Sequence, residues 1–248
     1  MYTQEEKWLL REKYNGVYAP EFERDKLRLK QGEPLAYIIG SVPFLNVKID
    51  VSLRPHTPRV ETEFWTEKVI EILKTDVRKE IRCLDLFSGS GCIGIAIAKN
   101  VLHAHVDLAD TDARCIQQIE KNILLNTIDC RNVRVLQSNM FSHVPGTYDY
   151  IFANPPYLAT KRIDRVADSV LSFEPHRALF GGSDGMDVIS CFLAECPKHL
   201  APHGRVFMEF DDRERDAIEE LVSKLSYRDV WFEKDQYGVW RYVHVSVR

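Results

Sequence analysis

From residue 61 onward, short apolar segments alternate with longer segments of mixed polarity. The short segments, such as IRCLDLF, AHVDLAD and YDYIFAN, are almost continuous in apolar residues, which is typical of strands buried on both faces of a sheet. The longer segments predict helices at 61–75, 92–100, 112–126, 186–200 and 213–224. This alternation predicts an α/β fold in which helices cover both faces of a parallel sheet.

The two ends of the chain depart from this pattern. Residues 4–14 and 21–31 are polar and compatible with short helices, and a segment rich in proline and glycine then leads to the alternation of a β-hairpin. The last two apolar segments, 227–234 and 239–247, are joined by a DQYG turn that is too short for a helical crossover. We therefore expect the last strand to be antiparallel.

These patterns predict two parts in the chain. Residues 56–248 would form a doubly wound, seven-stranded, Rossmann-like sheet with its last strand antiparallel. Residues 1–55 would form a small helical segment followed by a hairpin linker. The chain has 248 residues, of which 45% are hydrophobic, and this is enough for one full core and a small appendage.

Composition and charge exclude several classes of protein. The net charge of −4 and the lack of a Lys/Arg block argue against tight non-specific binding to DNA. The six cysteines contain no Cys-x-x-Cys pair, so we interpret them as reduced residues. No segment approaches the roughly 20 apolar residues of a membrane span, and the first residues lack the apolar stretch of a signal peptide. We expect a cytoplasmic protein.

The segment LDLFSGSGCIGIAIA predicts a strand, a glycine-rich turn and a helix. Gly89, Gly91 and Gly94 fit the G-x-G-x-x-G pattern of dinucleotide sites, and Asp110 ends the next strand, where an acid can bind ribose hydroxyls. A nicotinamide enzyme is therefore one interpretation. Asp85 favours another, because a carboxylate at the strand end would repel a pyrophosphate at the helix N-terminus. It suits a cationic ligand such as the amino group of S-adenosylmethionine.

A second strand end carries the sequence FANPPYLA. Two prolines stop the strand on a stiff turn. The side-chain oxygen of Asn154 and the backbone carbonyl of Pro155 could hold the two N–H groups of a planar acceptor nitrogen, which helps most when that nitrogen becomes positive during attack on a methyl group. Tyr157 could cover the flat face of the acceptor, with Phe152 packed behind. These residues predict methyl transfer to an amide or exocyclic amine nitrogen, with Asn154, Pro155 and Tyr157 as catalytic residues.

Several separate stretches resemble the bacterial HemK/PrmC family, class I S-adenosylmethionine-dependent methyltransferases that act on a glutamine of peptide chain release factors. The resemblance covers roughly residues 33–245 and includes GEPLAYIIGSVPF, TPRVETE, DLFSGSG, NPPY, FEPHRALFGGSDG and DQYGVWR. EPHRAL and GGSDG separate this family from DNA amino-methyltransferases, which share only the Asn-Pro-Pro-Tyr. The resemblance implies S-adenosyl-L-methionine as cofactor, a release factor as protein partner, and methylation of its glutamine side-chain amide.

The resemblance also implies roles for individual residues. Those for the cofactor are Phe87, Ser88, Gly89, Ser90 and Gly91 at its methionine end, Asp110 at the ribose, Asn139 and Met140 beside the adenine, and Asn154. Those for the substrate glutamine are Asn154, Pro155, Pro156 and Tyr157, with Arg59 and Glu61 at the mouth of the site.

Three positions depart from the family pattern. Phe87 replaces the first glycine of the loop, and Val60 replaces a proline. Asn139 stands where the family usually has an aspartate, so its contact with adenine would be neutral rather than charged. These changes alter the predicted cofactor site and leave the pair of acceptors at Asn154 and Pro155 intact.

Other functions remain open on the sequence. An adenine-N6 methyltransferase needs a target-recognition domain and a basic groove, and the sequence predicts neither, so we expect no sequence-specific binding to nucleic acid. A nicotinamide oxidoreductase shares the glycine pattern, and a binding protein without activity is a further alternative. We expect neither a membrane partner nor a metal, because the spacing of Cys191, Cys196, His199 and His203 matches no standard zinc site. Glu209 is either a strand-end acid near the pocket or a hydrogen-bonded group.

Overall fold

The computed structural model describes residues 2–225 and 227–247, so the outermost residues of the two predicted parts, 1 and 248, lie outside it. The strands of its main sheet are β3 (Ile81–Leu86), β4 (Ala104–Asp110), β5 (Val133–Gln137), β6 (Tyr148–Ala153), β7 (Leu200–Glu209), β8 (Val230–Lys234) and β9 (Trp240–Ser246). In the described chain these seven strands have the order β5-β4-β3-β6-β7-β9-β8. The pairs from β5 to β7 are parallel, and β9 is antiparallel to both of its neighbours. The predicted sheet and its antiparallel last strand are confirmed.

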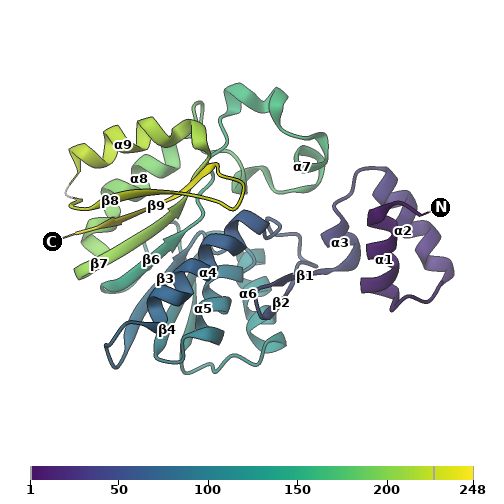
Figure 1. The fold of residues 1–248 in the computed structure, drawn as a ribbon, viewed down its shortest axis with the longest axis horizontal. Coiled ribbons are helices and arrows are strands. Elements are labelled where there is room, and N and C mark those ends of the chain that lie inside the picture. The colour runs from purple at the N-terminus through teal and green to yellow at the C-terminus, as the bar shows by residue number, and fades with distance from the viewer. Residues whose placement is uncertain (1, 226, 248) are drawn as a thin grey trace.

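Helices cover both faces of this sheet (Figure 1). One layer contains α4 (Val60–Lys74), α5 (Cys92–Asn100) and α6 (Ala113–Leu125), and the other contains α8 (Asp187–Glu195) and α9 (Arg215–Lys224). Trp65 of α4 is fully buried in the first core, and Phe192 of α8 is fully buried in the second. Successive residues of a strand point to opposite faces, so Phe152 of β6 joins the first core and Ile151 joins the second.

The predicted helix over 186–200 is shorter in the structure. It ends at Glu195, because Pro197 follows, and a 3₁₀ turn η3 (Cys196–His199) leads directly into β7. The sequence pattern also predicts no element between β6 and residue 186. The structure has there η1 (Thr160–Arg165), α7 (Asp168–Phe173) and η2 (His176–Ala178), and a further 3₁₀ turn, η4 (Asp212–Glu214), precedes α9.

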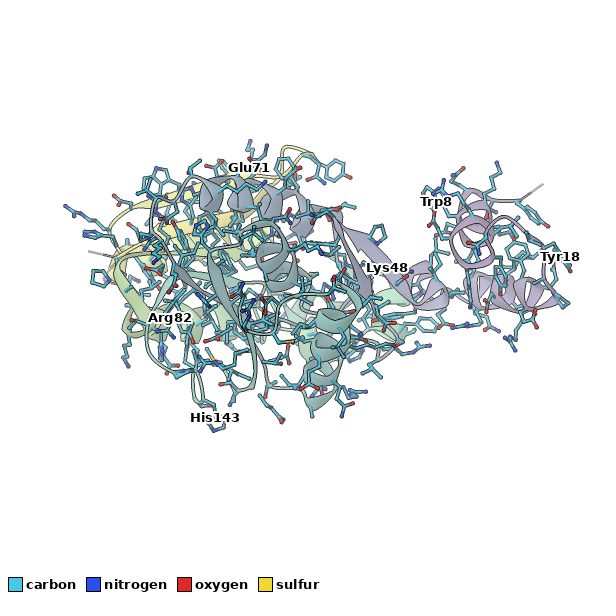
Figure 2. All side chains as sticks on the ribbon, turned by 90° about the horizontal axis from the view of Figure 1, so that it is seen from below. Trp8, Tyr18, Lys48, Glu71, Arg82 and His143 are labelled. Carbon is cyan, nitrogen blue, oxygen red and sulfur yellow. The ribbon has the colours of Figure 1, made fainter. Side chains whose placement is uncertain are left out.

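The N-terminal region is a separate small helical unit. It contains α1 (Gln4–Tyr14), α2 (Pro20–Lys30) and α3 (Leu35–Ile39), around a core of Leu9, Phe22 and Ile38. The sequence pattern missed α3, since its single turn is enclosed by Pro34 and Gly40 and looks like a connector. Trp8 and Tyr18 mark this unit in Figure 2, where the unit lies apart from the sheet.

A β-hairpin joins the helical unit to the sheet, and Lys48 marks it in Figure 2. Its strands are β1 (Ser41–Phe44) and β2 (Val47–Asp50), with Leu45 in the left-handed region at φ 52°. The hairpin is fastened to α6, because the side-chain amide of Asn122 accepts from the backbone N–H of Asp50 at 2.8 Å and donates to its carbonyl at 3.0 Å. The orientation of the linker therefore depends on a polar contact with the sheet layer.

No helix within residues 2–225 and 227–247 is long and apolar enough to cross a membrane.

Candidate active site

The two predicted site segments leave neighbouring strands. β3 and β6 pair in parallel, with Leu86 opposite Ala153, so the turns that follow them emerge side by side. The strand order also reverses here, since β4 lies on one side of β3 and β6 on the other. Ligands of doubly wound sheets bind at the carboxyl ends of the strands at such a switch point. The topology therefore brings the glycine turn and the Asn-Pro-Pro-Tyr turn to one site.

The glycine turn needs its glycines for different reasons. Gly91 has φ 80° at the start of α5, in the left-handed region that favours glycine. A Cβ atom on Gly94 would lie 2.7 Å from Cδ2 of Leu108, so this glycine allows α5 to pack closely against β4. Phe87 also has a positive φ, 63°, and its ring packs edge-on against Phe192 with centroids 5.9 Å apart. The replacement of a glycine by Phe87 is thus accommodated by the second core.

A cavity of about 250 Å³ opens beside this turn, and we call it the glycine-loop cavity. Ten of the predicted residues line it: Arg59, Phe87, Ser88, Gly89, Ser90, Asp110, Asn139, Met140, Asn154 and Pro156. Three predicted residues do not line it in the described chain: Asp85 of β3, Gly91 of the turn and Glu61 of α4. The structure thus brings most of the residues predicted for the cofactor around one cavity.

Asp110 is held where a ribose could meet it. One carboxylate oxygen accepts from the backbone N–H of Gly89 at 2.8 Å, and the other accepts from that of Asp112 at 2.8 Å. Burial raises the pKa of Asp110 above its ordinary value, although the hydrogen bond from Gly89 lowers it. The carboxylate is therefore fixed in position by the turn that it faces.

Asp85 lies behind the glycine turn rather than in the cavity. It is fully buried, and Oδ2 accepts from the backbone N–H of Gly94 at 2.9 Å, whereas Oδ1 has no hydrogen-bond partner within the described residues. Burial, with a further contribution from the charge of Asp110, raises the pKa of Asp85 to about 7. Its observed contact is with the start of α5.

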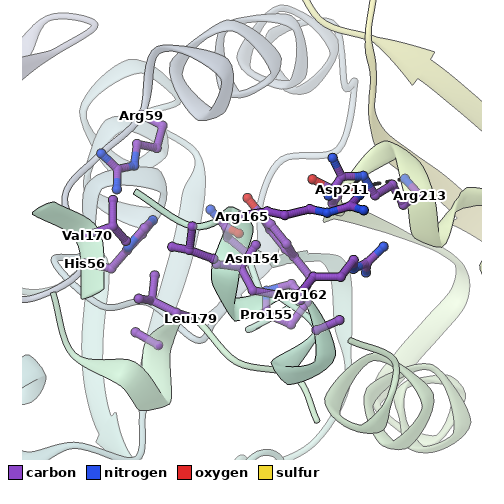
Figure 3. Close-up of a pocket in the computed structure, with 15 residues that line it drawn as sticks. His56, Arg59, Asn154, Pro155, Arg162, Arg165, Val170, Leu179, Asp211 and Arg213 are labelled. Atoms are coloured by element: carbon purple, nitrogen blue, oxygen red, sulfur yellow. Dashed lines mark hydrogen bonds and ion pairs between the residues drawn. The ribbon is translucent and has the colours of Figure 1, made fainter. Parts of the chain in front are cut away.

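A second cavity, of about 320 Å³, opens on the other side of the Asn-Pro-Pro-Tyr turn, and we call it the NPPY cavity. Asn154, Pro155 and Tyr157 line it, and Figure 3 shows Asn154 near its middle. Asn154 and Arg59 also line the glycine-loop cavity. Asn154 therefore stands at the border between the two spaces.

The GGSDG segment supports this turn from behind. A Cβ atom on Gly181 would lie 2.3 Å from the carbonyl oxygen of Pro156, and one on Gly185 would lie 2.3 Å from that of Tyr157. The backbone of Leu158 adds two hydrogen bonds: its N–H donates to the carbonyl of Leu179 at 2.8 Å, and its carbonyl accepts from the N–H of Gly181 at 3.0 Å. The two glycines are needed because the backbones approach too closely for any side chain.

The EPHRAL segment forms a strap that contributes to the lining of both cavities, and Ala178 lines each of them. Glu174 is buried, forms an ion pair with Arg59, and lies 2.6 Å from Nδ1 of His56. Burial raises the pKa of Glu174, but the hydrogen bond from His56 and the charges of His56 and Arg59 outweigh it and hold the pKa below its ordinary value. At the other end of the strap, Arg177 forms an ion pair with Asp112.

Sequence reasoning missed several residues of the site. His56, Thr62 and Arg177 line the cavities, and Glu174 orients Arg59. Arg177 and Glu174 belong to the EPHRAL stretch, and Thr62 belongs to TPRVETE, so the family-like stretches were the available signal. Within the residues that the structure describes, no group of three or more His, Cys, Asp or Glu side chains is arranged to hold a metal ion.

Comparisons with known proteins agree with this geometry. The Methyltransferase small domain family matches residues 63–182. The release factor glutamine methyltransferase of Thermodesulfovibrio yellowstonii is 34% identical over 213 residues, covering 86% of this chain and 75% of that protein. That of Flavobacterium psychrophilum is 30% identical over 240 residues, covering 95% and 83%.

A solved structure shows the same fold at low identity. It is the 16S rRNA N2 G1207 methyltransferase of T. thermophilus, in complex with AdoMet and guanosine, with a TM-score of 0.58 and 15% identity over 84% of this chain and 50% of that one. The fold, the border position of Asn154 and the identity to the curated relatives point in one direction. The chain belongs to the family of release factor glutamine methyltransferases.

Proposed function

We propose that this protein transfers a methyl group from S-adenosyl-L-methionine to the side-chain amide nitrogen of a glutamine in a peptide chain release factor. The observation that carries the proposal is the position of Asn154, which lines both the glycine-loop cavity and the NPPY cavity. A methyl donor in the first cavity and an acceptor in the second would meet at this side chain. The names of the curated relatives support the choice of substrate.

The Asn-Pro-Pro-Tyr turn would hold the acceptor nitrogen. An amide nitrogen is a poor nucleophile because its lone pair is delocalised, and two fixed acceptors on its N–H groups favour the geometry in which the lone pair is free. The side-chain oxygen of Asn154 and the carbonyl of Pro155 would be these acceptors, and their effect grows as the nitrogen becomes positive. The proton of the nitrogen becomes acidic at the same time, so the proposal requires no general base.

The glycine-loop cavity fits S-adenosylmethionine, which supplies a methyl group bound to a positively charged sulfur. Asp110 would accept from the ribose hydroxyls, as its fixed carboxylate suggests. Asn139 and Met140 would flank the adenine, and the backbone of residues 87–91 would surround the methionine end. The apolar lining of Phe87 and Ile93 beside the polar Ser88 matches a ligand with both kinds of surface.

The N-terminal part, residues 1–55, would dock the release factor beside the NPPY cavity. The unit exposes Trp8, Tyr18 and Leu27, which lie outside its small core. Aromatic side chains of this kind contribute strongly to protein interfaces. Residues 56–248 would then carry the cofactor and the chemistry.

Thermal unfolding tests the cofactor. A ligand that binds the native state raises the unfolding midpoint by an amount that grows with the ratio of its free concentration to its Kd. We expect S-adenosylmethionine to raise the midpoint and NADH to leave it unchanged. Stabilisation by NADH alone would favour a nicotinamide oxidoreductase and contradict the proposal.

A substrate assay tests the reaction. The protein is incubated with S-adenosylmethionine and either a bacterial release factor or duplex DNA, and mass spectrometry then locates any added methyl group. We expect a single methyl on a glutamine of the release factor and none on DNA. Methyl on adenine without methyl on glutamine would replace the proposal by an adenine-N6 methyltransferase.

A further inference from the structure

A buried carboxylate joins the Asn-Pro-Pro-Tyr turn to α4. Glu209, at the end of β7, is 1% exposed and accepts hydrogen bonds from three side chains. These are the hydroxyl of Thr62 at 2.7 Å, the indole N–H of Trp65 at 2.8 Å and the phenol of Tyr157 at 3.0 Å. The side-chain amide of Asn154 in turn donates to Oγ1 of Thr62 at 3.4 Å. Glu209 lines neither cavity, so its effect on the site passes through these partners.

The proton of Thr62 decides how the amide of Asn154 is oriented. A threonine hydroxyl has one proton, and here it points to the carboxylate of Glu209. Oγ1 can then only accept a further hydrogen bond, so the NH₂ end of the Asn154 amide is the end that satisfies it. The oxygen end of the amide is thereby left for the cavities that Asn154 lines.

We propose that Thr62 and Glu209 are positioning residues that fix the orientation of the Asn154 amide for the acceptor nitrogen. This inference rests on the proposed methyl transfer to a glutamine amide. An inverted Asn154 would present its own NH₂ to the NH₂ of the substrate, so two donors would meet without an acceptor, which is unfavourable in a desolvated site. The carboxylate and the hydroxyl prevent this inversion before the substrate arrives.

The same carboxylate fixes the aromatic side of the turn. Burial and then the charge of Glu209 hold the pKa of the Tyr157 phenol well above its usual range, so the phenol remains a hydrogen-bond donor. One buried group thus holds both the amide and the ring that the proposed function assigns to the acceptor.

The DQYGVWR stretch carries Arg241, a positively charged residue that acts on the buried carboxylate of Glu209. Asp235 accepts from the backbone N–H groups of Tyr237 and Val239 and from the guanidinium of Arg241, at 3.0 Å. Burial lowers the pKa of Arg241, but the hydrogen bond to Asp235 and the negative charge of Glu209 outweigh it. The positive charge of Arg241 is thus held on the last hairpin by Asp235 and interacts electrostatically with Glu209.

The test compares Thr62→Val with Thr62→Ser. Valine keeps the shape of threonine and removes the hydroxyl, whereas serine keeps the hydroxyl. With the release factor as substrate, we expect Thr62→Val to lower kcat by roughly 10-fold to 100-fold, the loss of one to two hydrogen-bond equivalents. The KM for the release factor and the Kd for S-adenosylmethionine should change by less than about 3-fold, because binding does not require a single amide orientation. Thr62→Ser should recover most of kcat.

Thr66→Val is the matched control for folding. Thr66 is fully buried one turn further along α4, and its hydroxyl donates to the backbone carbonyl of Thr62 at 2.7 Å. Its loss should lower the unfolding midpoint without lowering kcat. Equal losses of kcat in Thr66→Val and Thr62→Val would show a general packing effect and overturn the inference.

Glu209→Gln separates positioning from proton transfer. The glutamine oxygen can still accept from Thr62, so a positioning role predicts a smaller loss of kcat than Thr62→Val causes. A loss larger than that of Thr62→Val would assign a direct role to the carboxylate and contradict the inference.

A final measurement does not depend on the reaction. The side-chain amide of Asn154 is followed by ¹⁵N NMR and assigned through its absence in Asn154→Ala. We expect its hydrogen exchange to be several-fold slower in the wild type and in Thr62→Ser than in Thr62→Val, because a hydrogen-bonded amide is protected. Equal exchange rates in the wild type, Thr62→Ser and Thr62→Val would contradict the orientation mechanism, even if the protein methylates the release factor. Protection that depends on Thr62, in a protein that methylates no release factor, would instead reject the proposed function alone.

Discussion

The turns after β3 and β6 lie side by side, and they use glycine and proline in opposite ways. After β3, the glycines lie within the turn, and a Cβ atom on Gly89 would meet nothing closer than 4.0 Å, so the backbone is open to a ligand. After β6, the turn itself contains prolines, and the glycines lie in the GGSDG segment that packs against it, where a Cβ atom on Gly181 would lie 2.3 Å from the carbonyl oxygen of Pro156. Under the proposed function, the first turn would surround the cofactor, and the second would hold two acceptor atoms in fixed positions.

Asn154→Ala should give the largest effect, because it removes an acceptor from the rigid turn. We expect kcat to fall by on the order of 10² to 10³, the loss found when one fixed polar group is removed from a reacting centre. The Kd for S-adenosylmethionine, measured by calorimetry, should rise by only a few-fold, since most of the glycine-loop cavity is unchanged. A variant that keeps kcat would contradict the division of roles between the two turns.

Gly181→Ala tests whether the GGSDG segment, which packs against the Asn-Pro-Pro-Tyr turn, keeps that turn in place. The new methyl group would lie 2.3 Å from the carbonyl of Pro156, so the turn must move. We expect kcat to fall by roughly 10-fold to 100-fold and the free energy of unfolding to fall by about 1–3 kcal/mol.

Gly204→Ala is the control for Gly181→Ala. Its Cβ atom would lie 2.8 Å from the carbonyl of Ala201, within β7 and away from both cavities. We expect a similar loss of stability in urea unfolding without a loss of kcat. If both variants lose kcat equally, the support of the turn has no special part in activity.

Asp110→Asn tests the open turn. The neutral side chain makes weaker hydrogen bonds to ribose hydroxyls than a carboxylate does, so we expect the Kd for S-adenosylmethionine to rise by about 10-fold. At saturating cofactor, kcat should change by less than about 3-fold, because the acceptor turn is untouched. A loss confined to kcat would reverse the assignment of the two turns.

Asp85→Asn should have the smallest effect on kcat, because Asp85 lines neither cavity in the described chain, and its effect should lie in the pH dependence of stability. The pKa of Asp85 is raised from 3.8 to about 7 in the folded state, so between these values the folded protein holds a proton that the unfolded chain has lost. The stabilising contribution is complete below pH 4 and is lost as the pH rises through 7. We expect the wild type to lose roughly 3–4 kcal/mol relative to Asp85→Asn across this window, measured by denaturant unfolding. Parallel curves for the two proteins would contradict the burial of an unpaired carboxyl.

The sequence predicted the centre of the sheet well because its central strands are local apolar runs. Ile81–Leu86 and Tyr148–Ala153 are buried on both faces and need no distant partner to be recognised. Two local features hid other elements. The single turn of α3 lies between Pro34 and Gly40, and the short helices of 160–178 have too few residues for a helical period.

The candidate site was predicted where its residues are neighbours in the chain. The Asn-Pro-Pro-Tyr turn and the glycine turn each carry a short pattern with a chemical reason, and both line the cavities. The strap at Glu174 was not predicted, because its partner Arg59 lies 115 residues away. No pattern within one segment indicates such a pair.

The sequence by itself therefore determined the central strands, the two turns and the residues that the turns carry. Strand burial and turn geometry depend mainly on residues that are close in sequence. Folding alone established that β3 and β6 are neighbours and that Asn154 borders both cavities. It also joined Thr62 to Glu209, which are 147 residues apart, into the hydrogen-bond chain that orients the amide. A hydroxyl has only one proton, and where that proton goes depends on which acceptor the fold places beside it.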